Sequence, residues 1–171
     1  MEGNERRELL LHYLQTSTEP LSGTALARLL SVSRQVIVQD IALLRATNQN
    51  ILSTARGYLL YQQKATKVRR CFSVCHTTAQ IEDELCTMVD HGGTVLDVIV
   101  EHPIYGTIHA DLLMRNRRDI LDFVKKVETK QSVPLKELTQ DCHLHTVEAD
   151  NETILEEIEL ALKEKGYLIS G

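Results

Sequence analysis

The feature that most constrains the fold is a change in the pattern of predicted elements near residue 62. Before this point, apolar residues recur at helical spacing in three short segments, and a strand–turn–strand pattern follows them. After it, strand patterns alternate with helical patterns through to the end of the chain. Such a switch predicts two domains of different architecture, and 171 residues are enough for both.

The first part of the chain predicts a winged helix-turn-helix. The expected helices cover about 4–15, 22–30 and 34–46, and the expected hairpin covers about 51–61. Pro20 separates the first two helices, while Ser22 and Ser33 can cap the second and third because a serine oxygen accepts hydrogen bonds from free helix amides. Three helices and a hairpin within about sixty residues are typical of a DNA-binding winged helix.

The third helix would lie in the major groove, so its first residues are the candidates for reading bases. Arg can bind guanine through two hydrogen bonds, and Gln can bind adenine in the same way. The predicted DNA contacts are Ser33, Arg34, Gln35 and Gln39 to bases, with Thr24, Arg45 and the hairpin-tip Arg56 to the backbone or minor groove. The alternative is a helical module for protein contacts, in which these polar side chains are only solvated.

Charge is divided unevenly along the chain. Residues 1–70 hold ten Lys or Arg against five Asp or Glu, whereas residues 71–171 hold nine against nineteen. A basic N-terminal part on an acidic remainder predicts that the N-terminal part binds a polyanion, here double-stranded DNA. Because the positive charge of the N-terminal part is modest, we expect specific binding to require a homodimer that reads two half-sites.

The sequence predicts a cytoplasmic protein without a membrane partner. The apolar runs are too short to span a bilayer, and the N-terminus has no apolar signal core. The four cysteines are therefore expected to be reduced packing residues. On a strand, Cys142 would face the side opposite to His143.

The second part predicts an α+β domain. Strands are expected near 68–75, 95–100, 107–113, 132–138 and 143–147, and helices near 78–91, 117–128 and 151–166. Thr77 and Gln80 have the spacing of a capping box for the first of these helices. This order favours a mostly antiparallel sheet with helices on one face. We place the domain boundary between residues 64 and 65, within a polar and basic linker over 62–70.

The strongest chemical signal is the pair His143 and His145. Side chains two residues apart on a strand point to the same face, so both imidazoles can reach one point. Glu84 lies at the edge of the apolar stripe of its predicted helix, where a buried carboxylate needs a cation or a hydrogen-bond donor. His76 precedes that helix and can add a third nitrogen. This set suits a divalent transition metal (Ni, Zn, Fe, Mn or Co) and leaves coordination positions open.

Other interpretations remain open from the residues alone. The histidines could be buried without a metal in a plain dimerisation domain, with Glu84 paired to a lysine, an arginine or a protonated histidine. A metal-dependent enzyme would need a general base, but Glu82 and Asp83 do not share the face of Glu84. We find no second acid–base pair and expect no enzyme.

Several motifs together resemble a known family. The motifs are Ile81-Glu82-Asp83-Glu84-Leu85, Gly92-Gly93, the stretch from Leu96 to Pro103, Tyr105-Gly106 and His143-Leu144-His145, and they resemble the three-histidine (3H) domain. Residues 5–61 resemble the biotin-repressor-like helix-turn-helix. Nearly the whole chain is thus similar to the nicotinate-responsive transcriptional repressors of NAD biosynthesis and niacin uptake. Relatives of the helix-turn-helix class often have Arg where this chain has Gln39.

The resemblance implies an HPr-like two-layer α/β fold for the second domain and a homodimeric protein. It implies a divalent metal, such as nickel, and the family's metal ligands carry over onto His76, Glu84, His143 and His145. It also implies that nicotinic acid acts as co-repressor, and our candidates for the effector pocket are His102 and Tyr105. The alternative is a metalloregulator, in which the metal ion itself is the signal.

Overall fold

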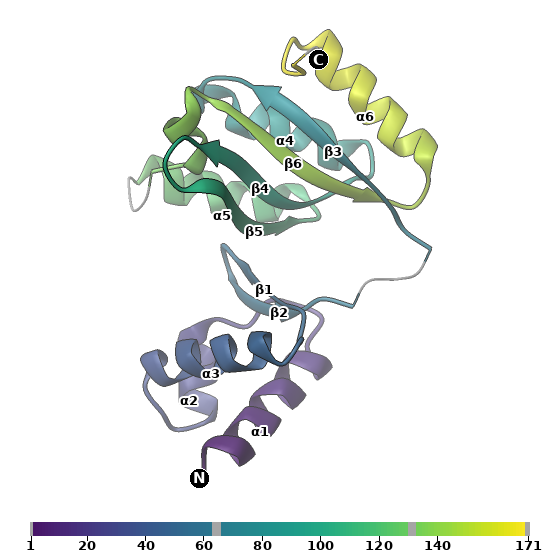
Figure 1. The fold of residues 1–171 in the computed structure, drawn as a ribbon. Coiled ribbons are helices and arrows are strands. Elements are labelled where there is room, and N and C mark those ends of the chain that lie inside the picture. The colour runs from purple at the N-terminus through teal and green to yellow at the C-terminus, as the bar shows by residue number, and fades with distance from the viewer. Residues whose placement is uncertain (1, 63–65, 130–132, 170–171) are drawn as a thin grey trace. The chain divides into compact units, whose positions relative to one another are not determined.

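The structure, a computed structural model, describes residues 2–62, 66–129 and 133–169. It divides into two compact units, Met1–Gln63 and Lys64–Gly171, each with its own hydrophobic core (Figure 1). The boundary that we predict between residues 64 and 65, and the middle of the predicted linker, lie outside the described residues.

The first unit consists of three helices followed by a hairpin. Its elements are α1 (Gly3–Thr16), α2 (Gly23–Leu29), α3 (Arg34–Ala46), β1 (Ile51–Thr54) and β2 (Gly57–Leu60). Ser22 and Ser33 cap α2 and α3 as predicted, because their hydroxyl oxygens accept hydrogen bonds from Ala25 N (3.0 Å) and Val36 N (3.3 Å). Aliphatic side chains of the three helices and β1 fill a common core, so the elements of a winged helix-turn-helix are all present.

A short backbone pairing holds the hairpin to the helices. Leu21, just before α2, and Tyr58 in β2 exchange two hydrogen bonds of 2.8 Å. Gly57 permits this close approach, because its φ is +143° and a Cβ there would lie 2.3 Å from Leu21 O. The hairpin is therefore fixed in position relative to the start of α2.

The second unit is a four-stranded antiparallel sheet with three helices packed on one face (Figure 1). Its elements are β3 (Val68–Cys75), η1 (Thr78–Gln80), α4 (Ile81–Asp90), β4 (Thr94–His102), β5 (Gly106–Met114), α5 (Arg117–Glu128), η2 (Leu135–Thr139), β6 (Cys142–Ala149) and α6 (Glu152–Glu164). The strand order β3-β6-β4-β5 places β6 in the interior of the sheet. Leu85, Ile120 and Ile158 from the three helices pack with Val95 and Val147 in one core, which confirms the predicted α+β class.

One predicted element of this unit is wrong, and the predicted linker is too long at its end, where the predicted strand over 68–75 is present as β3. The described part of the strand expected over 132–138 is the 3₁₀ helix η2, and Ser132 lies outside the described residues. Pro134 precedes this helix and has no N–H to donate to a strand partner, which favours a helical start over a ladder. Residues 68–70 belong to β3 rather than to the linker, and Arg69 forms an ion pair with the buried Glu148 of β6.

The chain after α6 returns along the outer edge of β3. Cys75 N donates to Tyr167 O, and Ile169 N donates to Ser73 O, each at 2.9 Å. An isolated bridge joins Val74 and Leu168 between these bonds. These bonds pair Ser73 O and Cys75 N, at the C-terminal end of the outer edge of β3.

Candidate metal centre and DNA-binding face

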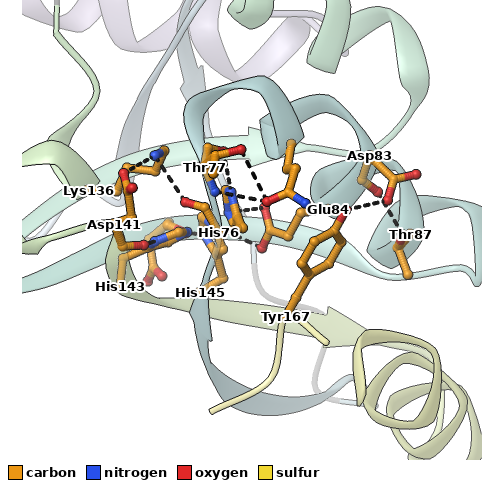
Figure 2. Close-up of polar contacts among 12 residues, drawn as sticks. His76, Thr77, Asp83, Glu84, Thr87, Lys136, Asp141, His143, His145 and Tyr167 are labelled. Carbon is orange, nitrogen blue, oxygen red and sulfur yellow. Dashed lines mark hydrogen bonds and ion pairs between the residues drawn. The ribbon is translucent and has the colours of Figure 1, made fainter. Parts of the chain in front are cut away.

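Three histidines and one glutamate from separate parts of the chain meet on the helix-covered face of the sheet (Figure 2). His143 and His145 lie on β6, His76 directly follows β3, and Glu84 lies in the first turn of α4. All four residues are buried, with exposed fractions of 5% or less. The structure therefore brings together the four residues that the sequence singles out as metal ligands.

Glu84 lies between the imidazoles. Its Oε2 is 3.4 Å from His76 Nε2, and its Oε1 is 3.4 Å from His145 Nε2. The His143 ring centroid lies 4.9 Å from that of His76 and 4.8 Å from that of His145. Potential ligand atoms of His76, Glu84 and His143 all lie within 4.8 Å of one another, and His145 joins this group through its contact with Glu84.

Backbone carbonyls fix the orientation of all three imidazoles. The Nδ1 contacts are His76 to Thr77 O (2.8 Å), His143 to Asp141 O (3.0 Å) and His145 to Asp97 O (2.6 Å). A carbonyl oxygen only accepts hydrogen bonds, so each Nδ1 carries a proton and each Nε2 of a neutral ring keeps its lone pair. Histidines that bind metals are commonly held in this way, with the second ring nitrogen donating to a carbonyl or carboxylate.

Two atoms at the centre of the cluster lack hydrogen bonds. His76 Nε2 and Glu84 Oε1 are fully buried, and neither has a hydrogen-bond partner among the described residues. Leaving a buried polar atom unpaired costs about 1–3 kcal/mol. A divalent cation would satisfy both atoms, and a set of three imidazole nitrogens and one carboxylate suits a transition metal.

Electrostatics keep two of the four candidate ligands, Glu84 and His143, in the protonation states that a metal requires. Burial by itself raises the pKa of Glu84, but the attraction of His145 and then His76 outweighs it and lowers this pKa to about 2. Burial first, and then the charge of His145, together lower the pKa of His143 to about 4. Burial also opposes protonation of His145, but Glu84 outweighs it and the pKa of His145 is raised. At neutral pH, Glu84 is therefore ionised and His143 is neutral.

A small pocket of about 40 Å³ lies beside the cluster. Its walls are mostly apolar and include Leu112 of β5, Phe123 of α5 and Leu135 of η2. Lys136 also lines it, although only 3% of this residue is exposed. Its Nζ donates to His76 O at 3.2 Å and forms an ion pair with Asp141 (Figure 2). The pocket thus combines apolar walls with a buried positive charge and the four candidate ligands.

The residues proposed from sequence for the effector pocket lie elsewhere in the second unit. His102 ends β4, and Tyr105 lies in the turn before β5 with 76% of its surface exposed. His102 Nδ1 accepts hydrogen bonds from Ile104 N and Tyr105 N, both at 3.2 Å, so it stabilises the turn. Neither residue lines the pocket beside the cluster, and their role in effector binding stays a prediction.

The residues proposed to read bases lie along α3. Arg34, Gln35 and Gln39 are all exposed, while the opposite side of the helix packs into the core. Ser33 caps the helix, so its hydroxyl is already engaged by Val36 N. The geometry of α3 is compatible with entry of its N-terminal half into a groove.

The residues proposed to contact the DNA backbone have different surroundings. Thr24 is exposed in the first turn of α2. Arg45 donates from Nε to Ile51 O and from Nη2 to Ser53 Oγ, both at 2.7 Å, so it fastens β1 to the end of α3. The arginine of the hairpin turn, Arg56, donates from Nη2 to Glu19 Oε2 at 2.9 Å. Both arginines support the hairpin, and their phosphate contacts stay predictions.

Comparisons with known proteins agree with this organisation. A model of the 3H domain matches residues 69–171, and a model of an HTH domain matches residues 6–59. The chain belongs to the 3H-domain family of transcription repressors. This confirms the family predicted from the motifs, and it places the chain among regulators rather than enzymes.

Two relatives of this family extend over nearly the whole chain. The probable transcription repressor NiaR of Thermotoga maritima is 46% identical over 165 residues, which cover 96% of this chain and 94% of the relative. The transcription repressor NadR of Bacillus subtilis is 40% identical over 170 residues, which cover 98% of this chain and 94% of the relative. Within the part of the chain that the structure describes, no helix has the length and apolar character needed to cross a membrane.

Two residues that support the cluster in this 3H domain, Asp97 and Lys136, were not predicted from the sequence. Asp97 lies where β4 shifts register against β6, and this shift directs its carbonyl to His145 while its Oδ1 accepts from Thr146 N at 2.8 Å. This bulge has no clear sequence signal, because the residues on both sides of Asp97 are continuous apolar runs that fit a regular strand equally well. Lys136 lies in a polar stretch, where a lysine is normally solvated.

Proposed function

We propose that this 3H-domain protein is a metal-containing, homodimeric repressor that binds operator DNA and uses nicotinic acid as co-repressor. Its target genes would be those of NAD biosynthesis and niacin uptake. The observation that carries the proposal is the convergence of three carbonyl-oriented imidazoles on the buried Glu84. The exposed start of α3 supports DNA recognition. The relatives named as transcription repressors support repression of transcription rather than activation.

The donor set supports a divalent transition metal held by His76, Glu84, His143 and His145. When bound, the metal supplies positive charge and open coordination positions beside the pocket. The chain's own contribution is orientation, because backbone carbonyls hold the three Nδ1 atoms and so direct the Nε2 atoms toward Glu84. Glu84 offsets part of the charge of the ion in a buried setting.

The pocket supports a small aromatic anion as effector. Nicotinate carries a carboxylate and a pyridine nitrogen, and either group could occupy an open metal position. Phe123 and Leu135 provide apolar contacts for its ring, and Lys136 provides a buried cation within an otherwise acidic domain. A cavity that holds a benzene ring measures about 150 Å³, whereas this pocket measures about 40 Å³. We therefore expect η2, which carries Leu135 and Lys136, to shift when nicotinate binds.

Effector and DNA binding would be linked through the dimer. A ligand shifts an equilibrium only by binding one state more tightly than the other. Nicotinate would favour the dimer geometry in which the two α3 helices match the operator half-sites. This predicts that operator DNA in turn raises the affinity for nicotinate.

Isothermal titration calorimetry on full-length protein tests the proposal. Nicotinate should bind the Ni²⁺- or Zn²⁺-loaded protein and should not bind the same protein after chelation. The His143→Ala/His145→Ala double variant should lose both the metal and the nicotinate signal, whereas a His12→Ala/His91→Ala double variant, which removes two exposed histidines outside the cluster, should keep both.

Equal nicotinate binding by the His143→Ala/His145→Ala variant would refute the proposed site. Metal binding that strengthens operator binding while nicotinate has no effect would favour the metalloregulator alternative, which uses the same four ligands.

A further inference from the structure

Two cysteines lie opposite each other on the strands that carry the histidine cluster. Cys75 ends β3, Cys142 begins β6, and the two residues are direct partners in the antiparallel register. Each precedes a member of the cluster, His76 and His143 respectively. Both thiols are free and half-buried. Because neighbouring residues of a strand face opposite sides, the thiols lie on the sheet face away from His143.

The backbone geometry of this pair favours close contact between the thiols. Cys75 N donates to Tyr167 O on the outer edge of β3, so its N–H points away from β6. Cys75 and Cys142 are therefore a non-hydrogen-bonded pair, the class in which the Cα atoms are about 4.5 Å apart and the side chains are closest. That separation lies within the range of about 4.4–6.8 Å that a disulfide can bridge. Cys75 Sγ contacts Gln140 O at 3.7 Å, two residues before Cys142, so this thiol lies at the end of the strand pair where β6 begins.

We propose that Cys75 and Cys142 are a redox modification site, at which a low-molecular-weight disulfide such as oxidised glutathione drives formation of a cross-strand disulfide. The thiolate of one cysteine attacks a sulfur of oxidised glutathione, which forms a mixed disulfide and releases one glutathione thiol. The thiolate of the second cysteine then attacks the protein sulfur of that mixed disulfide and releases the second glutathione. Two protein thiols are oxidised, one glutathione disulfide is reduced to two thiols, and the two protons pass to the glutathione thiolates.

The other two cysteines have no such partner position. Cys71 lies within β3 opposite Thr146, and Cys86 lies on α4. All four cysteines are among the described residues, and Cys75 with Cys142 is the only pair in direct register. The proposed disulfide is therefore selective within the chain.

Oxidation should affect the neighbouring cluster, and this part of the inference rests on the proposed metal site. A disulfide most often holds its Cα atoms about 5.5–6 Å apart, which is about 1 Å wider than a non-hydrogen-bonded strand pair. Widening at this point would displace His76 and His143, which follow directly in sequence. Disturbing the supports of metal ligands commonly weakens metal binding by about 10–100-fold, so we expect at least about tenfold weaker binding in the oxidised protein.

Disulfide mapping tests the modification site. Full-length protein is incubated with oxidised glutathione at about pH 9, where more thiolate is present, then alkylated and analysed by peptide mass spectrometry. We expect a peptide pair linked through Cys75 and Cys142, both in the natural chain and in a Cys71→Ser/Cys86→Ser variant. The Cys75→Ser and Cys142→Ser variants, with folding checked by circular dichroism, should lack it. Recovery of both cysteines as separate alkylated or glutathionylated residues, or links mainly through Cys71, would overturn the proposal.

Titration with Ni²⁺ alone, before and after oxidation, separates the two parts of the inference. A tenfold loss of affinity that dithiothreitol reverses supports the coupling to the cluster, and an unchanged affinity refutes it. If the reduced protein binds no metal, the proposed metal site fails, while the disulfide map still decides the modification site independently.

Discussion

At the scale of single residues, two adjacent carboxylates of α4 have opposite environments. Glu84 is buried among the histidines, whereas Asp83 accepts a hydrogen bond from Tyr167 Oη at 2.7 Å (Figure 2). Asp83 also accepts a hydrogen bond from Lys165 Nζ at 2.8 Å. Glu84→Gln should lower the affinity for Ni²⁺ or Zn²⁺ by at least about 100-fold, because it removes the anionic ligand. Asp83→Asn, a matched change at the next position, should leave the metal affinity within about threefold of the natural protein. Calorimetric metal titration measures both, and equal losses in the two variants would contradict the assignment.

The exposed start of α3 gives a second prediction at this scale. Arg34→Ala should weaken binding to specific operator DNA by about 5–150-fold, equivalent to about 1–3 kcal/mol, because an Arg–guanine pair is lost. Arg118→Ala removes the same charge from an exposed position of α5 and should have little effect. Fluorescence anisotropy with DNA from upstream of the protein's own gene provides the measurement. An unchanged affinity for Arg34→Ala would exclude this residue from base recognition.

The metal ligands could be predicted at the residue scale because their signal is local. Strand alternation places His143 and His145 on one face, and helix periodicity separates Glu84 from Asp83. The residues that support these ligands could not be predicted, because their roles depend on tertiary contacts. Asp97, for example, directs its backbone carbonyl oxygen to Nδ1 of His145 at 2.6 Å from the neighbouring strand, which no spacing within β4 reveals.

At the scale of elements, the hairpin of the first unit depends on one glycine. Gly57→Ala should lower the free energy of unfolding of this unit by about 1–3 kcal/mol or more, because strain at a positive φ is joined by a clash with Leu21 O. Gly106→Ala is the matched control: its φ is +72°, but nothing lies within 4 Å of the added Cβ. Chemical denaturation followed by circular dichroism should show the larger loss for Gly57→Ala. A smaller loss there than at Gly106 would contradict the role of this turn.

A second contact between elements predicts a dependence on pH. Arg117 at the start of α5 makes two hydrogen bonds to Asp90 at the end of α4 (2.9 and 2.6 Å), and this lowers the pKa of Asp90. A carboxyl group with a lowered pKa stabilises the fold above its unfolded pKa of about 3.9 and loses this contribution as pH falls through the folded pKa. Because the pair is largely exposed, Asp90→Asn should lower Tm by no more than about 3 °C at pH 7.

The Asp90→Asn variant also tests the predicted direction of this pH dependence. The difference in Tm between the natural protein and Asp90→Asn should shrink as the pH falls below about 3.9 and through the lowered pKa of folded Asp90. A difference that stays constant as the pH falls would show that the contact is not electrostatic.

Most elements could be predicted because their caps and periodicities are local. The capping box of Thr77 and Gln80 forms as expected, although the turn it caps is the 3₁₀ helix η1 that leads into α4. The segment 135–139 was predicted as part of a strand over 132–138, but it folds as η2. Pro134 cannot donate to a strand partner, and Leu135 and Lys136 line the pocket beside the histidines, a tertiary contact that no local pattern reveals.

At the scale of the whole molecule, the chain joins a helix-turn-helix unit to an acidic 3H domain, and the motifs alone were enough to predict this pairing. The oligomeric state and the coupling between the domains depend on contacts that a single sequence does not encode locally. If nicotinate acts as co-repressor, the metal-bound pocket must favour the state that binds operator DNA.

Operator binding by metal-loaded protein, with and without nicotinate, tests this central claim most directly. A gel shift with DNA from upstream of the protein's own gene should show about 5–150-fold tighter binding when nicotinate is present, the usual range of allosteric coupling. The effect should vanish in the Glu84→Gln variant. Identical operator affinity with and without nicotinate, in protein shown to contain the metal, would contradict the account.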